Sequence, residues 1–271
     1  MILKSTLINA LFLLSLVKQK PVVCQMASNS SVEISTQNFN SQIQNASELD
    51  LVKQRIRMAN SSLTMIKVLH IGDSHVKSGF FSEPLMQKLN DYYGKKYNGK
   101  LFFNFQPVCK IGTKYTDYDQ LPELSEQLKN ELPDLVIISL GTNDAFSGSS
   151  ETDFYQKVDH LISKIKAISP NSSILITTPP DALKFDKHRQ TYVALPEVEH
   201  VVNVLIKYAN DHHIAYWDMY QAMGGTNSMN SWYQKKLTMP DRVHFNAEGY
   251  GILAQSLFEA FVTSVENNQP N

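Results

Sequence analysis

From about residue 63, runs of apolar residues alternate with segments in which apolar residues recur every three or four positions. The runs have the length of strands. They carry few polar residues, as expected for strands buried on both faces of a parallel sheet. We therefore predict strands at Met65–Ile71, Leu101–Phe105, Leu135–Leu140, Ile174–Thr177 and Ile214–Trp217.

The segments between these runs predict amphipathic helices. One apolar stripe runs from Phe154 to Ile168, a second from Val198 to Ala209 and a third from Tyr250 to Val265. Alternating strands and helices favour a three-layer α/β/α domain around a parallel sheet of about five strands. Active sites of such domains gather in the loops at the carboxyl ends of the strands.

The N-terminal segment differs from the rest of the chain. An apolar run from Leu7 to Val17 follows Lys4, and it is too short to span a bilayer, which needs roughly 20 residues. The pattern is typical of a secretory signal peptide, which we place at residues 1–26. We therefore expect a secreted or periplasmic protein without a membrane span. Cys24 is a conceivable lipoprotein acceptor, but the residues before it form a poor lipobox.

Residues 27–62 are rich in Ser, Asn and Gln, which predicts a polar spacer with at most a short helix at 48–59. The catalytic domain is then expected at 63–265, with a tail at 266–271. The net charge of -1 over 271 residues, without a basic run, gives no support for nucleic-acid binding. Only two cysteines occur, Cys24 and Cys109, so a disulfide framework is excluded.

Three polar motifs follow predicted strands or precede the last helix. The first is Gly-Asp-Ser-His at 72–75, directly after the strand Met65–Ile71. Ser74 therefore lies on a strand-to-helix turn. A serine at this place is either a helix N-cap or a nucleophile near the positive end of a helix dipole.

The second motif, Gly-Thr-Asn-Asp at 141–144, follows the strand Leu135–Leu140. These residue types are common in turns. The alternative is that the amide of Asn143 donates to an oxyanion, a task that suits neutral donors fixed at a strand end.

The third motif is Asp-Arg-Val-His at 241–244, just before the last helix. Asp241 can hold one ring nitrogen of His244 and leave the other free to take a proton, as in a serine triad. The alternative is a loop in which Asp241 caps the helix. A metal site is less well supported, because no further ligands stand at a suitable spacing, and the adjacent pair His212 and His213 need not chelate.

A nucleophile, a glycine after the second strand (Gly112), an amide donor and an Asp-x-x-His pair occur in this chain order. In this the sequence resembles the SGNH or GDSL hydrolases from about residue 65 to 262, which implies their flavodoxin-like fold. The resemblance implies Ser74 as nucleophile, His244 as base and Asp241 as its orienting partner. It also implies an oxyanion hole of Ser74 N–H, Gly112 N–H and Asn143, and a structural role for Asp73. Ile111 precedes Gly112 where the family commonly has Asn.

The histidine of the first motif and the segment 216–225 resemble the bacterial peptidoglycan O-acetylesterase branch. The resemblance therefore implies a serine esterase, without metal or organic cofactor, that removes O-acetyl groups from a cell-wall polysaccharide. An O-acetyltransferase on a glycan, an esterase for acetylated xylan or sialic acid, a lipase and a non-catalytic glycan-binding protein remain alternatives. Among the aromatic residues near the last motif, Trp232 and Tyr233 are candidates for a sugar platform.

Overall fold

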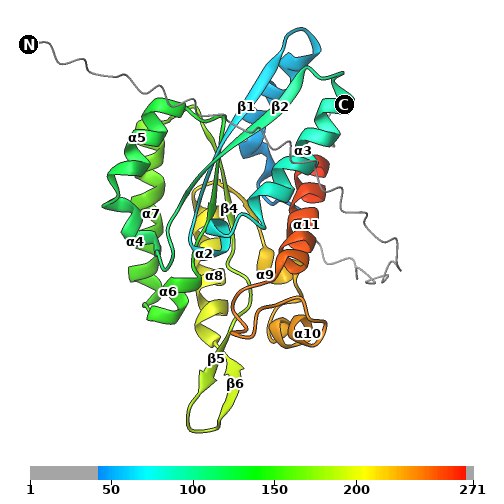
Figure 1. Ribbon diagram of the computed structural model, residues 1–271. Coiled ribbons are helices and arrows are strands. Elements are labelled where there is room, and N and C mark those ends of the chain that lie inside the picture. The colour runs from blue at the N-terminus through cyan, green and yellow to red at the C-terminus, as the bar shows by residue number, and fades with distance from the viewer. Residues whose placement is uncertain (1–41, 267–271) are drawn as a thin grey trace, which may run out of the picture. The chain divides into compact units, whose positions relative to one another are not determined.

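The computed structural model describes residues 42–266, which form one parallel sheet with helices on both faces (Figure 1). The strand order is β2-β1-β3-β4-β7. The chain passes outward from β1 to β2 and then returns to build the other half from β3, so the order reverses at β1. This is the flavodoxin-like order, in which ligands bind beyond the carboxyl ends of the strands near the reversal. The strands are β1 (Thr64–Gly72), β2 (Leu101–Cys109), β3 (Leu135–Ser139), β4 (Ser173–Thr177) and β7 (Ala215–Trp217).

Both faces of the central strands are buried, because alternate side chains enter two separate apolar cores. In β3, Leu135 and Ile137 enter one core, while Val136 and Ile138 enter the other. All four are at most 2% exposed. This double burial is why the strands are continuous apolar runs in the sequence. The predicted fold class and all five predicted strands are thereby confirmed, with shifts of a few residues at most in their bounds.

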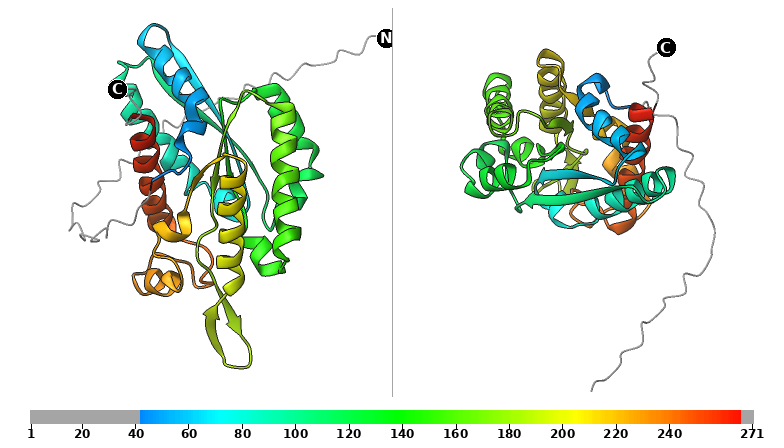
Figure 2. Two further views of the ribbon diagram at one scale, coloured as in Figure 1. Left: turned by 180° about the vertical axis from the view of Figure 1, so that it is seen from behind. Right: turned by 90° about the horizontal axis from the view of Figure 1, so that it is seen from above.

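The helices divide between the two faces (Figure 2). The last helix, α11, packs on α3, and α3 packs on β2. The first face carries η1 (Ala46–Leu49), α1 (Asp50–Arg57), η2 (Met58–Asn60), α3 (Ser82–Lys96), α9 (Met219–Ala222), α10 (Ser228–Gln234) and α11 (Ala247–Glu266). The second carries α4 (Tyr115–Asp119), α5 (Pro122–Glu131), α6 (Thr142–Ser147), α7 (Glu151–Ile168) and α8 (Pro196–Asp211). The short α2 (Ser74–Lys77) follows β1 directly.

Residues 42–62, the later part of the expected polar spacer, are folded against the sheet. Leu49, Val52 and Ile56 are at most 1% exposed and belong to the first core. Gln44 exchanges two backbone hydrogen bonds with Tyr216 of β7. The apolar face of α1 is therefore part of the core, although its polar face gives the segment the composition of a spacer. The expected signal peptide, residues 27–41 and the tail beyond Glu266 lie outside the described residues.

An antiparallel hairpin that the sequence analysis did not predict follows β4. It consists of β5 (Leu183–Asp186) and β6 (Thr191–Ala194) and projects beyond the helices at the carboxyl end of the sheet (Figure 1). At its tip, Asp186 accepts hydrogen bonds from the backbone N–H groups of His188 and Arg189. The carboxylate thereby stabilises the turn, as Asp commonly does.

Candidate active site

The turn from β1 into α2 places Ser74 at the carboxyl end of the sheet. Gly72 is the last residue of β1, and a Cβ there would lie 2.1 Å from Cγ2 of Val76. Only glycine therefore fits this close approach. Asp73 caps α2 by accepting the backbone N–H of His75 at 2.9 Å. Ser74 is the first residue of the helix, where backbone N–H groups have no intrahelical acceptor.

The structure brings Ser74, His244 and Asp241 into one line of hydrogen bonds. Ser74 Oγ lies 2.8 Å from His244 Nε2, and His244 Nδ1 lies 2.7 Å from Asp241 Oδ2. Burial alone would raise the pKa of Asp241, but hydrogen bonds from the backbone and ring of His244 lower it below its usual value. Asp241 is therefore a carboxylate that can only accept, so Nδ1 carries the proton and Nε2 is free to accept from the serine hydroxyl.

Local hydrogen bonds fix the loop that carries His244. Oδ1 of Asp241 accepts from the backbone N–H of both Val243 and His244 at 3.0 Å, and Met239 N–H donates to His244 O at 2.7 Å. Arg242 has a φ of 54°, in the left-handed region that non-glycine residues seldom adopt. The side chains of Asp241 and His244 remain 51% and 33% exposed, so the pair lies at the surface.

Asn143 joins the second motif to the first. Its Nδ2 lies 2.9 Å from Asp73 Oδ2 and 3.1 Å from the carbonyl oxygen of Thr113. Thr113 follows Gly112, which has a φ of 78° in the turn after β2. The loops of Ser74, Gly112 and Asn143 therefore converge. Both protons of the Asn143 amide are directed at protein acceptors in this arrangement.

The family comparison decides the class of protein. Residues 71–252 match the family model described as GDSL-like lipase/acylhydrolase, which spans more than half of the chain. The chain belongs to this family. Its activity class is accordingly carboxylic ester hydrolysis. No curated protein sequence matches the chain.

Solved structures of other acylhydrolases share this fold. A peptidoglycan O-acetylesterase matches with a TM-score of 0.73 and 18% identity over 82% of this chain and 97% of that chain. An acetyl xylan esterase matches with a TM-score of 0.53 and 20% identity over 72% and 99% of the two chains. A two-domain esterase active on acetylated mannans matches with a TM-score of 0.59 and 16% identity. This match covers 86% of this chain and 59% of that chain. At these identities the likeness shows the fold.

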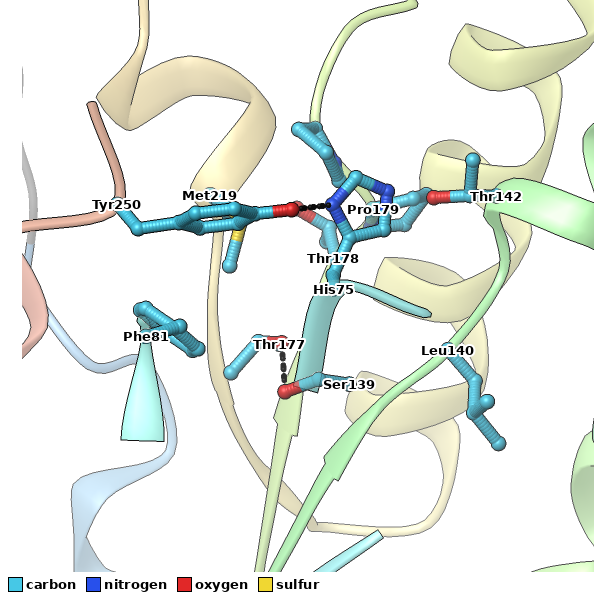
Figure 3. Close-up of a pocket in the computed structure, with 11 residues that line it drawn as sticks. His75, Phe81, Ser139, Leu140, Thr142, Thr177, Thr178, Pro179, Met219 and Tyr250 are labelled. Carbon is cyan, nitrogen blue, oxygen red and sulfur yellow. Dashed lines mark hydrogen bonds between the residues drawn. The ribbon is translucent and has the colours of Figure 1, made fainter. Parts of the chain in front are cut away.

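His75, the residue after Ser74, lines a pocket of this acylhydrolase together with Tyr250 (Figure 3). Its Nδ1 lies 2.8 Å from the Tyr250 hydroxyl, and its ring centroid lies 5.0 Å from that of His244. Burial lowers the pKa of His75, and a charge on His244 would lower it further, although Asp73 and Asp241 act in the opposite direction. The lowered pKa favours a neutral His75 imidazole beside His244. The contact with Tyr250 could not be predicted from the sequence, because nothing in the local pattern links His75 to Tyr250.

Burial reduces the number of aromatic residues that are available to a sugar. Trp217, Tyr220 and Trp232 are 0%, 3% and 9% exposed and pack in the cores. Tyr233 is 38% exposed. Of the two candidates for a sugar platform, Tyr233 is therefore accessible and Trp232 is not.

Asp144, the last residue of the second motif, has a structural role. Its carboxyl group is buried and accepts from the backbone N–H of Tyr115 at 3.3 Å. Burial raises its pKa to about 7. Asp144 therefore links α6 to the start of α4 on the side away from the solvent.

Among residues 42–266, no helix has the length and apolar character needed to cross a membrane.

Proposed function

We propose that this acylhydrolase removes O-acetyl groups from an O-acetylated polysaccharide, with peptidoglycan as the substrate, through an acetyl-serine intermediate on Ser74. The observation that carries the proposal is the 2.8 Å contact between Ser74 Oγ and His244 Nε2. It joins a hydroxyl to an imidazole whose other nitrogen is held by a carboxylate, the arrangement that activates serine as a nucleophile.

In the first step, His244 Nε2 takes the proton of Ser74 as Oγ attacks the acetyl carbonyl carbon. The resulting oxyanion collapses, the bond to the sugar oxygen breaks, and His244 gives its proton to the departing alcohol. Water then attacks the acetyl-serine with His244 again as base, which releases acetate and restores Ser74. The negative charge of Asp241 stabilises the imidazolium in both steps.

The oxyanion hole consists of the backbone N–H groups of Ser74 and Gly112 and the side-chain amide of Asn143. The N–H of Ser74 is free at the start of α2. The longer of the two hydrogen bonds of the Asn143 amide is the 3.1 Å bond to Thr113 O. The N–H group that donates this bond reaches the oxyanion either by donating to both acceptors or by leaving Thr113 O. The other hydrogen bond, to Asp73, holds the amide in place meanwhile, which gives Asp73 a positioning role.

The solvent exposure of His244 and Asp241 supports an ester substrate with a bulky alcohol and a small acyl group. Both side chains are substantially exposed, so a polymer can approach the base from the solvent. A lipase would require a deep apolar site for a long acyl chain. The fold shared with a peptidoglycan O-acetylesterase and the histidine in the first motif support peptidoglycan over a neutral glycan.

Acetate release tests the proposal. The full chain is incubated with O-acetylated peptidoglycan, with acetylated xylan and with a soluble aryl acetate, beside the Ser74→Ala variant. We expect free acetate from peptidoglycan at the highest kcat/KM and none above background from the variant. Transfer of acetyl to a second glycan instead of water would favour an O-acetyltransferase. A preference for decanoyl over acetyl esters would favour a lipase.

The N-terminal segment supports action outside the cytoplasm. The apolar run from Leu7 to Val17 behind Lys4 is typical of a secretory signal peptide. Sequencing the N-terminus of the protein recovered from the extracellular or periplasmic fraction tests this. We expect a new N-terminus near residue 27, whereas an intact Met1 would contradict the proposal.

A further inference from the structure

Arg242 lies between two tyrosine rings beside the base. Its guanidinium carbon is 4.3 Å from the ring centroid of Tyr192 in β6 and 4.2 Å from that of Tyr233 in α10. Both distances are well within the range of favourable cation–π contacts. The guanidinium is therefore contacted by two elements that are distant in sequence.

Within the described part of the chain, the guanidinium of Arg242 has no acidic partner. Among residues 42–266 it makes no hydrogen bond or ion pair, and its Nε is shielded from solvent. Removing part of a charge from water without a counter-charge is unfavourable. A carboxylate is the natural complement, because its two oxygens match the planar fork of a guanidinium.

The backbone of Arg242 is fixed in the loop that carries His244. Arg242 stands two residues before His244, and its carbonyl oxygen accepts from the backbone N–H of Leu183 at the start of β5. Its left-handed φ turns the chain between Asp241 and Val243. The hairpin thus contacts the Asp241–His244 loop twice, through Leu183 and through Tyr192.

The hairpin beside Arg242 is basic. Residues 183–194 contain Lys184, Lys187 and Arg189 against one acid, Asp186, whereas the whole chain has a net charge of -1. The three basic side chains are exposed, as is Phe185, whose ring packs against Tyr192. A basic surface with exposed aromatic rings suits a sugar polymer that carries negative charge.

We propose that Arg242, held between Tyr192 and Tyr233, binds a carboxylate of the glycan whose acetyl ester lies at Ser74. The substrate is then an acidic O-acetylated glycan, and the β5–β6 hairpin extends the binding surface for it. This inference rests on the proposed deacetylation of a glycan and adds that the carboxylate determines which glycan is accepted.

Matched substrates test this role. O-acetylated peptidoglycan and acetylated glucuronoxylan are each used before and after amidation of their carboxylates, and kcat/KM for acetate release is measured. For the wild-type protein we expect amidation to lower kcat/KM about tenfold or more, mainly through KM, since hydrogen bonds between charged groups have this strength. The two glycans separate a carboxylate of peptidoglycan from a uronate.

Two variants assign the preference to Arg242. In Arg242→Met the ratio between free and amidated substrate should fall to about one, and Arg242→Lys should restore it only in part, because lysine lacks the planar fork. Arg57→Met is the control: Arg57 is exposed at the end of α1, near the amino end of β1, and its removal takes away the same charge. We expect the control to keep the wild-type ratio.

An unchanged ratio in Arg242→Met, or an equal loss of kcat on free and amidated forms, would overturn the inference and leave Arg242 as a support of the loop. Binding of the insoluble glycans by the Ser74→Ala protein measures the same preference without turnover. If the wild-type protein hydrolyses an aryl acetate but neither glycan, the proposed function fails. A binding preference for free carboxylates that Arg242→Met abolishes would still support the carboxylate site.

Discussion

The turn that carries Ser74 is enclosed by the core, whereas the loop that carries His244 lies half in solvent. Asp73 is 1% exposed, and Gly72 leaves no room for a Cβ. Asp241, by contrast, is 51% exposed and is held by hydrogen bonds within its own loop. The position of Ser74 is therefore coupled to the packing of the sheet, while the position of His244 is set locally. Substitutions in the first region should affect folding and activity together, and those in the second should affect activity alone.

The largest expected effect is that of His244→Ala, in the exposed loop. Loss of the proposed base should lower kcat by about 10⁴-fold or more. The free energy of unfolding should change by less than about 1 kcal/mol, because the side chain is partly exposed. Hydrolysis of an aryl acetate and urea denaturation measure the two quantities. A strongly destabilised variant would contradict the comparison.

Asn143→Ala tests the enclosed region. Removal of this proposed oxyanion donor should lower kcat by roughly 10²–10³. The variant should also be less stable by about 1–3 kcal/mol, because Asp73 Oδ2 and Thr113 O lose their partner. The same two assays apply. A loss of stability with an unchanged kcat would leave Asn143 a structural role only.

Gly72→Ala tests packing in the same region. The added methyl group would meet Val76 at 2.1 Å, so we expect a loss of about 3 kcal/mol or more together with reduced activity. Gly251→Ala in α11 is the matched control, since no atom lies within 4 Å of its Cβ position. Alanine there should stabilise the helix by up to about 1 kcal/mol. Equal effects of the two substitutions would show that Gly72 is not confined as described.

The effect on stability alone is a pH dependence from Asp144. Burial raises its pKa to about 7, so the folded protein holds a proton that the unfolded chain releases above about pH 4. The stability associated with this proton is fully present below pH 4 and is lost as the pH rises to 7, by about 1 kcal/mol per pH unit. Asp144→Asn should flatten this decline in urea denaturation at pH 5, 6 and 7. An identical decline in the variant would assign the dependence to other groups.

The sequence predicts the sheet well because its strands are buried on both faces and thus appear as apolar runs. Once these strands are predicted, the motifs that directly follow them can be placed at the carboxyl end of the sheet. The contribution of residues 43–60 to the core could not be predicted from composition. One face of α1 is buried in the core, while its other face gives the segment a polar composition. The hairpin was missed because β5 and β6 have only four residues each, and because β5 carries the charged residues Lys184 and Asp186. Contacts such as His75 with Tyr250, or Arg242 with Tyr192 and Tyr233, depend on the folded chain and leave no local pattern.

The most direct test of the account is covalent trapping of the nucleophile. The folded wild-type protein and His244→Ala are treated with a fluorophosphonate, and the modified peptide is located by mass spectrometry. The account predicts one modification, on Ser74, that forms much more slowly in His244→Ala because the hydroxyl lacks its base. Modification of another residue, or no modification of the folded wild-type protein, would contradict it.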